Sequence, residues 1–399
     1  MDLFDEALLR DPASGFSALR ERAAVVRVAV PPAWLVTRYS DVKLVLGDRR
    51  FVNDVANVPG GDAPDLGAQA LAARGIPPEL VTYLATGMLE LDGTDHLRLR
   101  KLVSRAFTAR RVAELRPRVE EIAERLLDRL PSAAEHGVVD LLEHFAAPLP
   151  IIVICELVGV PEQDRHLWRA WSGALTGAGD LGDTLREMVA YVQELISARR
   201  EKPEDDLVSA LVRAQEEDGD RLSDVEMTTL IVTIVVAGHE TTSNLIGNGT
   251  AALLSHPDQL AALHADPGLL PRAVDELLRW CGPAKMTRMR YATEDVEISG
   301  TLVRKGEAVI AVLFGANFDP RAFADPERLD ITRDRAPHVA FSHGMHFCLG
   351  AALARQEGEV AFDALFRRFP GMKLAVAPED LQRPLDPGSW RLGTLPVTL

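Results

Sequence analysis

Apolar residues recur at helical spacing along most of the chain, and they alternate with polar residues in only a few short stretches. The alternating stretches predict strands at residues 24–30, 34–38 and 294–312. The helical spacing predicts helices over residues 41–46, from His96 to about residue 130, over 140–158, 162–174, 183–201, 205–216, 257–265 and 268–281, and from near Cys348 onward. Residues 55–80 and 315–347 are expected to be irregular because Pro, Asp, Gly and Arg dominate them.

One further helix is predicted to be long and apolar, from Ser223 to about Leu254. The sequence Ser-Asp-Val-Glu at its start is a capping box, in which Ser223 and Glu226 each bond the backbone amide of the other. At 1.5 Å per residue the helix is about 45 Å long, enough to cross a whole domain. Its longest uncharged run, residues 227–238, suits a buried core helix and is too short to span a bilayer.

The composition gives the size and the net charge of the chain. The chain has 399 residues, a formal net charge of −15 and 47% hydrophobic residues. No linker divides it, so we expect a single domain over residues 1–399, mainly α with small β-sheets. The negative charge argues against nucleic-acid binding, and the acidic N-terminus lacks the basic-then-apolar pattern of a signal peptide. We therefore expect a cytoplasmic protein that binds neither nucleic acid nor membrane.

Cys348 is the first candidate for chemistry. The chain's three cysteines are far apart, which implies neither a disulfide framework nor a CxxC metal clip. A lone cysteine in a helical protein is usually a small buried hydrophobe. Cys348, however, stands at the start of a predicted helix, whose free amides and positive end stabilise a thiolate. Gly344 and Gly350 flank it where the backbone must bend or approach a flat group, and His346 can project toward an anionic group.

Residues 237–242, Ala-Gly-His-Glu-Thr-Thr, interrupt the long apolar helix. A glycine inside a helix costs about 1 kcal/mol relative to alanine, and an unpaired glutamate in an apolar run is costly to bury. The structural interpretation is a kink with a satisfied polar cluster. The functional interpretation is a groove beside a ligand, in which Gly238 leaves room for dioxygen while Glu240 and Thr241 relay protons to it.

Two sets of charged residues lie outside these motifs. Glu276 and Arg279 form an i,i+3 pair of a kind common on helix surfaces, and residues 325–330 offer Arg328 as the third member of a buried structural network. The members of a second set, taken one by one, are ordinary charged residues of helices and strands. Together they are cations spaced to bind two carboxylates: His96, Arg100 and Arg290.

In this order and spacing the motifs resemble those of the cytochrome P-450 superfamily, and the match is to its soluble bacterial members. It covers residues 90–360 closely. The family string FxxGxHxCxG is met by Phe341, Gly344, His346, Cys348 and Gly350. The ExxR pair is met by Glu276 and Arg279, and the oxygen-groove motif by Ala237, Gly238, Glu240 and Thr241. Ser342 and Leu329 stand where Gly and Phe are commoner, and neither touches the chemistry.

The resemblance implies a triangular helical domain around a buried heme b, iron protoporphyrin IX with the Cys348 thiolate as its axial ligand. It also implies a monooxygenase reaction, with Glu240 and Thr241 delivering protons to dioxygen. His96, Arg100 and Arg290 correspond to the family's contacts with the heme propionates, and the anionic group toward which His346 can project would be such a propionate.

The substrate is expected to be a medium-sized, largely apolar molecule that is hydroxylated or epoxidised, such as a polyketide, terpenoid or peptide being tailored. The recognition loops are expected at residues 55–90, 165–185 and 283–289. The lining residues are expected to include Met88, Leu89, Ala237, Thr241, Ala284 and Met286. Lys285, in the third loop, either meets an anionic group of the substrate or extends to solvent, and we favour the second interpretation.

Electrons are expected to arrive from another protein, because the chain has neither a GxGxxG after a strand nor a four-cysteine set for an iron–sulfur cluster. We expect a ferredoxin that is reduced by a flavin-dependent ferredoxin reductase. The patch of this chain on which the ferredoxin is predicted to dock is one helix face with three basic residues, Arg98, Lys101 and Arg105. The residues between them, Leu99, Val103 and Phe107, are predicted to face inward.

Three other functions are weighed against this one. A heme-thiolate peroxygenase running on peroxide is disfavoured, because such family members lack the acid–alcohol pair that Glu240 and Thr241 supply. A heme-binding sensor without turnover leaves that pair unexplained. A zinc hydrolase using His343, His346 and Cys348 lacks an HExxH motif or a second ligand cluster.

Overall fold

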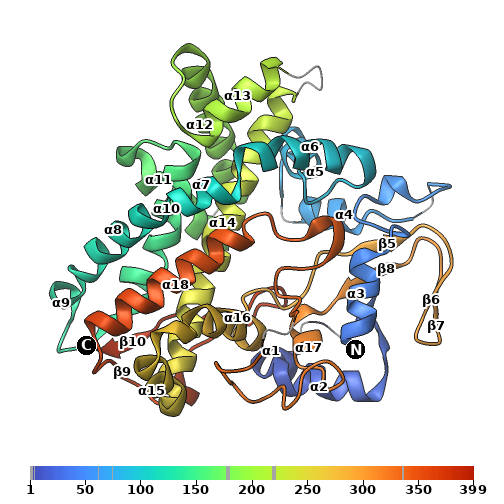
Figure 1. Ribbon diagram of the computed structural model, residues 1–399. Coiled ribbons are helices and arrows are strands. Elements are labelled where there is room, and N and C mark those ends of the chain that lie inside the picture. The colour runs from blue at the N-terminus through green and yellow to red at the C-terminus, as the bar shows by residue number, and fades with distance from the viewer. Residues whose placement is uncertain are drawn as a thin grey trace. The chain divides into compact units, whose positions relative to one another are not determined.

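Helices make up most of the fold, and the sheets are small (Figure 1). The computed structural model describes residue 3 and residues 5–61, 63–73, 75–176, 180–217, 222–334 and 337–399. The fold class predicted from the sequence, mainly α with small β-sheets, is therefore confirmed.

The chain's contacts divide it into two compact units, neither of which is a continuous stretch of sequence. Unit 1 comprises Met1–Ala63, Arg116–Leu149 and Thr241–Leu399, and unit 2 comprises Pro64–Leu115 and Pro150–Glu240. Two of the boundaries fall inside continuous helices, α10 (Pro148–Val158) and α14 (Asp224–Ser255). The single domain over residues 1–399 stays a prediction.

Unit 1 holds the sheets. The largest has the order β1-β2-β8-β5-β3, and β2 and β8 are its parallel pair, with Leu35 opposite Ile310. Residues of β2 and β8 are buried from both sides, Leu35 and Ala311 completely, which explains their continuous apolar runs. The strands are β1 (Val25–Val28), β2 (Ala33–Val36), β3 (Phe51–Val52), β4 (Val139–Asp140), β5 (Arg290–Ala292), β6 (Val296–Ile298), β7 (Thr301–Val303), β8 (Ala308–Ala311), β9 (Lys373–Leu374) and β10 (Pro396–Thr398).

The helices of unit 1 pack against this sheet and against one another. α18 lies along α8, and α16 packs on α18 (Figure 1). The α-helices are α1 (Glu6–Arg10), α2 (Pro12–Arg22), α3 (Tyr39–Gly47), α8 (Arg116–Leu127), α9 (Leu130–Ala133), α15 (Pro257–Ala265), α16 (Leu270–Cys281), α17 (Leu313–Asn317) and α18 (Ala351–Arg368). Shorter helical turns are η1 (Val55–Asn57), η2 (Leu142–Ala146), η4 (Pro267–Leu269), η5 (Gly344–His346) and η6 (Pro378–Asp380).

Helices joined by turns and loops make up the described residues of unit 2, which include no strand. The side chains of Leu99 and Val103 on α6 (Gly93–Ala106) and of Phe107 directly after it are buried, as predicted. Besides parts of α10 and α14, the unit contains α4 (Leu66–Ala73), α5 (Pro78–Ala85), α6 (Gly93–Ala106), α7 (Ala109–Glu114), η3 (Glu162–Asp164), α11 (Arg165–Thr176), α12 (Leu181–Glu201) and α13 (Leu207–Glu217).

The long helix α14 begins with the predicted capping box. The amide of Glu226 donates to Ser223 Oγ over 3.2 Å, and the amide of Ser223 donates to Glu226 Oε2 over 2.8 Å. By length and composition alone, α14 is the one helix among the described residues that could cross a membrane. Because 61% of its most apolar window is buried inside the protein, α14 has the character of a core helix.

Two predictions of local structure need correction. Residues 55–80, expected to be irregular, contain η1, α4 and the start of α5. Residues 62 and 74 of that segment lie outside the described residues. The strands β4, β9 and β10 form a three-stranded sheet that was not predicted, since strands of two or three residues leave no periodic signal.

Candidate functional site

Cys348 differs from the other two cysteines in its exposure. Its thiol is exposed, whereas Cys155 and Cys281 are buried, and burial raises the pKa of each to about 12. The amide of Cys348 donates to the carbonyl of Phe341 over 2.9 Å, so the loop closes on itself just before α18. The exposed thiol of Cys348 therefore lies near the positive end of α18, which favours the thiolate form.

Two glycines lie beside Cys348, and a close contact fixes the first of them. Gly344 has a φ of +71°, and a Cβ atom there would lie 2.7 Å from the carbonyl oxygen of Leu46, so only glycine fits. At Gly350 the nearest atom to such a Cβ would be Cys348 Sγ, at 4.0 Å. The loop is thus held against the carboxyl end of α3 on one side and leaves the sulfur accessible on the other.

Two residues that were predicted to contact an anionic group, Arg290 and His346, lie in the same region of unit 1. Arg290 is 5% exposed and its Nη1 donates to the carbonyls of Val45 and Leu46 over 3.0 and 3.1 Å, at the end of α3. His346 Nε2 lies 2.7 Å from Asn53 Nδ2. The carboxyl end of α3 therefore contacts both Arg290 and the Cys348 loop, which brings the predicted thiolate ligand and one predicted propionate contact to one helix end.

The middle of α14 carries the motif at residues 237–242. Ala237 and Thr241 are exposed, although α14 is buried on both sides of them at Val235 and Thr242. They are four residues apart and share one helix face. This face is exposed halfway along a core helix, and the groove beside it stays a prediction.

Packing also explains why residue 238 is a glycine. A Cβ atom there would lie 3.0 Å from Cγ1 and 3.1 Å from Cδ1 of Ile154 on α10. The space that a side chain would need is therefore taken by Ile154, and the predicted role of Gly238 toward dioxygen remains a proposal. His239 is next in sequence, and burial lowers its pKa.

The other predicted site residues are spread over both units. On α6, His96 is fully buried and Arg100 is half-buried. Of the predicted lining residues outside α14, Leu89 is 39% exposed, Met88 is buried, and Ala284 and Met286 are half-buried.

The zinc ligand set considered from the sequence does not form. No group of three or more His, Cys, Asp or Glu side chains among the described residues is placed to hold a metal ion.

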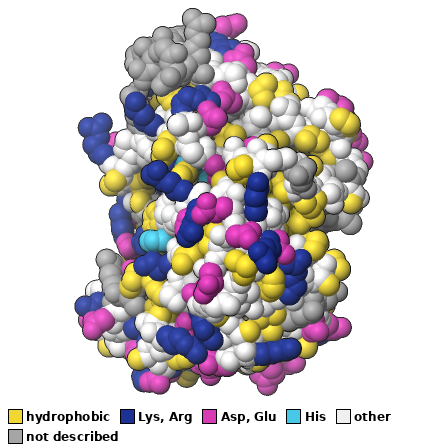
Figure 2. Space-filling model, turned by 90° about the vertical axis from the view of Figure 1, so that its right-hand side faces the viewer, with side chains coloured by type: hydrophobic (Ala, Val, Ile, Leu, Met, Phe, Trp, Pro, Cys, Tyr) yellow, Lys and Arg dark blue, Asp and Glu magenta, His cyan; other side chains and the backbone are white. Residues whose placement is uncertain are grey.

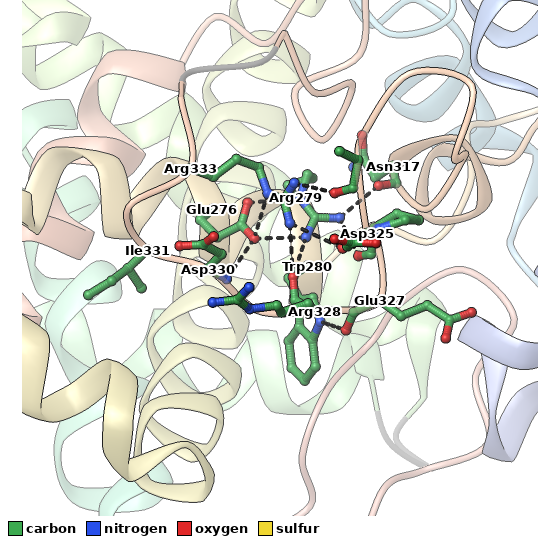
Figure 3. A network of polar contacts seen from close by, with 12 residues as sticks. Glu276, Arg279, Trp280, Asn317, Asp325, Glu327, Arg328, Asp330, Ile331 and Arg333 are labelled. Carbon is green, nitrogen blue, oxygen red and sulfur yellow. Dashed lines mark hydrogen bonds and ion pairs between the residues drawn. The ribbon is translucent and has the colours of Figure 1, made fainter.

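The Glu276–Arg279 pair is the centre of a buried network (Figure 3). Arg279 is 1% exposed, and its Nε and Nη2 donate to the two carboxylate oxygens of Glu276 over 2.8 Å each. The guanidinium also donates to the carbonyls of Asn317, Pro326 and Arg328. The network fastens the loop at residues 317–333 to α16, as expected of a structural device.

The third cation of this network is Arg333 and not the Arg328 side chain predicted from the sequence. Arg333 Nε donates to Glu276 Oε1 over 3.2 Å, and its guanidinium also donates to carbonyls of the loop. Arg328 contributes its carbonyl oxygen, while its own side chain is exposed (Figure 3). The arginines of this loop correctly predicted a third member of the network. Which arginine side chain points toward Glu276, however, depends on the path of the loop.

The docking patch on α6 stays a prediction, and the structure shows how two of its three residues lie. Arg98 is engaged in an ion pair with Glu226, the glutamate of the capping box. Burial alone would raise the pKa of Glu226, but the hydrogen bonds from Arg98 and Ser223 outweigh it and leave this pKa below its ordinary value. Lys101 is exposed, and the side chain of Arg105 lies outside the described residues. Acidic and basic side chains are interspersed on the face that Figure 2 shows.

Lys285 is buried, contrary to the prediction that it extends to solvent. Its side chain is 1% exposed, and Nζ lies 5.6 Å from the ring of Trp390 without a hydrogen-bond partner among the described residues. Burial lowers its pKa to about 8; Asp386 opposes this shift and Arg383 adds to it. The amide of Lys285 donates to the carbonyl of Gly388, so the segment at 386–390 covers the side chain.

We expect Lys285→Met to stabilise the protein at neutral pH. Because the folded-state pKa is about 8 and the ordinary value is 10.5, the unfolded state binds more protons between these pH values. The stability of the wild type should therefore rise as pH increases from about 8 to about 10.5, by about 3 kcal/mol. Urea unfolding measured against pH should show this rise for the wild type and for the control Lys305→Met, whose lysine is exposed. If the Lys285→Met protein showed the same pH dependence, the rise in stability could not be assigned to Lys285.

Comparison with known proteins adds relatives over the whole chain. A family model described as "Cytochrome P450" matches residues 165–267 and 268–396. The 6-deoxyerythronolide B hydroxylase of Saccharopolyspora erythraea is 44% identical over 373 residues, which cover 92% of this chain and 90% of the relative. The cytochrome P450 monooxygenase PikC of Streptomyces venezuelae is 44% identical over 393 residues, covering 97% and 91%. The solved structure of PksS from Bacillus subtilis superposes with a TM-score of 0.89 at 38% identity, covering 100% of this chain and 99% of that one.

Proposed function

Since the chain belongs to the cytochrome P450 family and is therefore a heme-thiolate monooxygenase, we propose that Cys348 supplies the thiolate and that heme b is the heme it holds. The observation that carries this assignment is the exposure of Cys348 at the start of α18, while the other two thiols are buried. A thiolate-ligated heme supplies the activation of dioxygen and favours cleavage of the O–O bond. The protein's residues orient the reactants, move protons and exclude water.

The remaining residues divide into those that hold the heme and those that serve the reaction. Phe341 and Gly350 frame the thiolate, and the propionates are held by His96, Arg100, Arg290 and His346. Ala237 and Gly238 border the oxygen groove. Glu240 and Thr241 transfer protons, because a carboxyl group and a hydroxyl next to each other in a mostly apolar helix form a short relay. The exposed face at Ala237 and Thr241 supports this role.

The substrate is proposed to be a medium-sized, largely apolar product of secondary metabolism that the enzyme hydroxylates or epoxidises. The name of one relative, the polyketide biosynthesis cytochrome P450 PksS of Bacillus subtilis, supports a polyketide, and the apolar candidates Met88, Leu89, Ala284 and Met286 suit such a molecule. The proposed electron donor is a ferredoxin with a flavin-dependent reductase. Because Glu226 compensates the charge of Arg98, docking on α6 would rest on Lys101 and Arg105. The proposed location is the cytoplasm.

The absorption spectrum of the ferrous carbonyl adduct tests the proposed ligation. A thiolate ligand shifts the main band strongly to the red relative to a histidine ligand. The purified holoenzyme should show the shifted band. A main band at the histidine-type position would contradict the proposal.

Thr241→Ala is expected to separate electron consumption from product formation. Without the hydroxyl, protons reach dioxygen less selectively, so reductant should still be consumed while product falls and hydrogen peroxide rises. General acid–base catalysis contributes about 10²–10⁴-fold, so the loss of product should be plain. The matched control is Thr241→Ser, which keeps the hydroxyl and should keep product and reductant in step. Equal coupling in the wild type and Thr241→Ala would make the residue structural.

A further inference from the structure

A hollow of about 270 Å³ lies on the surface of unit 1, between α15, η4, α16 and the second half of α18. Its lining includes none of the residues assigned above to the heme, the proton relay or the substrate. On α18 the lining begins at Phe362, about 16 Å along the helix axis from Ala351, and the Cys348 loop precedes Ala351. The hollow is therefore separate from the proposed heme site.

The buried part of the lining is apolar. Phe362 and Phe366 present nearly parallel rings, with centroids 6.5 Å apart and an angle of 18° between their planes. α14 packs directly against Phe362, because a Cβ atom at Gly249 would lie 2.5 Å from Phe362 Cζ. Four buried side chains form this part of the lining: Leu263, Leu270, Phe362 and Phe366. Water that contacts such side chains finds few hydrogen-bond partners, so an apolar group that displaces it binds favourably.

The exposed part of the lining is charged. Arg367 lines the mouth of the hollow and is shared by two carboxylates: its Nη2 donates to Glu124 Oε1 over 2.6 Å, and its Nε lies 3.5 Å from Asp363 Oδ2. Two carboxylates and one guanidinium leave a net charge of −1 at the mouth. The side chains of Asp363 and Glu124 are 48% and 37% exposed, so each carboxylate has oxygen lone pairs left for a second partner. The mouth therefore favours a cation over an anion.

We propose that this hollow is a second ligand site, which binds a flat apolar molecule that carries one ammonium group. The apolar body lies against Phe362 and Phe366, and the ammonium group lies at the mouth beside Asp363. The aromatic rings add to the attraction, because a cation is favoured near a ring face. The volume is just below the range of about 300–1,000 Å³ that is typical of ligand sites, so it suits a molecule of about two fused rings. The proposal does not depend on which substrate or electron donor the enzyme uses.

The probes are naphthylmethyltrimethylammonium, whose quaternary nitrogen cannot ligate iron, and naphthalenesulfonate, an anion with the same ring system. Binding is measured by titration calorimetry on the holoenzyme, which is first saturated with clotrimazole. The azole ligates the heme iron and keeps the probes out of the heme pocket, and its three-ring body is too bulky for the hollow. Low ionic strength is used, because salt screens interactions between exposed charges.

The wild type should bind the cation with a Kd of about 0.1–1 mM, as expected for a ligand of this size. It should bind the anion about 3- to 10-fold more weakly, because the mouth is partly exposed and its charge is partly screened. Asp363→Asn should weaken binding of the cation by about 2- to 5-fold. The matched control is Asp295→Asn, since Asp295 is an aspartate of the same unit that is also 48% exposed and paired with an arginine, Arg304. This control should bind both probes as the wild type does.

Leu270→Trp tests the location, because the larger side chain should fill the hollow and abolish binding of both probes. Each variant is first checked for the red-shifted carbonyl band as a sign of the folded holoenzyme. If Leu270→Trp lacks that band, Asp363→Lys at its exposed position takes its place and should reverse the preference, so that the anion binds more tightly than the cation.

The proposal is overturned if the wild type shows no binding of the cation in the millimolar range, or if it binds the anion equally well. It is also overturned if Asp363→Asn and a folded Leu270→Trp both bind the cation as tightly as the wild type, because the cation would then bind elsewhere.

Discussion

Cys348→Ala protein is expected to lose the red-shifted carbonyl band completely and to retain little heme after purification. The reason is that Cys348 is the exposed thiol, while the other two are buried and their pKa values are raised to about 12. Neither buried thiol can replace it, because a buried thiol stays protonated and inaccessible to iron. The measurements are the absorption spectrum of the ferrous carbonyl adduct and the ratio of heme to protein.

Cys281→Ala is the matched control. Cys281 is 2% exposed and packs in the apolar cluster around α16, so the variant should lower stability but keep the shifted band in every folded molecule. If Cys348→Ala kept that band, or if Cys281→Ala lost it while still binding heme, the assigned ligand would be wrong.

Glu276→Ala is expected to lower the free energy of unfolding by about 3–5 kcal/mol, because it leaves the charge of Arg279 buried without its carboxylate. Arg279 would keep only the carbonyls of Asn317, Pro326 and Arg328, which do not neutralise a full charge. The loop at residues 317–333 should loosen with it, so heme loading should fall. Urea unfolding of the purified protein and heme content are the measurements.

Two arginine variants separate the network in the structure from the one that the sequence predicted. Arg333→Ala removes a side chain bonded to Glu276 and should be clearly destabilising. Arg328→Ala keeps the carbonyl that Arg279 uses and should change stability by no more than about 0.5 kcal/mol. If Arg328→Ala were the more destabilising of the two, Arg328 would supply the charge. A soluble, fully heme-loaded Glu276→Ala protein of low activity would show that the Glu276–Arg279 pair serves the reaction and not folding.

The features that the sequence predicted correctly are local ones. The capping box is defined by four consecutive residues, and its two hydrogen bonds form as expected. The Cys348 motif is similarly short, and its Gly344 is required by a positive φ and by its contact with a single helix end. Buried faces such as Leu99 and Val103 on α6 follow from helical periodicity alone.

The features that the sequence did not predict depend on partners far along the chain. Arg98 pairs with Glu226 from a different helix, which no periodicity in either segment reveals. Lys285 is buried because residues 386–390 cover it, and the choice between Arg328 and Arg333 depends on the path of an irregular loop. Long-range packing also gave Gly238 its contact with Ile154.

The continuity of α10 and α14 across the unit boundaries matters to anyone who recombines this enzyme with its relatives. A chimera that exchanged residues 150–240 as a block would cut α10 after its second residue and α14 in its interior. About four backbone hydrogen bonds span a cut through the interior of an α-helix, so the junction in α14 would join two turns whose facing side chains come from different parents. Crossover points at the turns, after Ala147 and after Ser255, keep each helix whole and of one parentage. Exchange of substrate-recognition segments between homologues should therefore tolerate a boundary at a helix end far better than one placed at the border between the units.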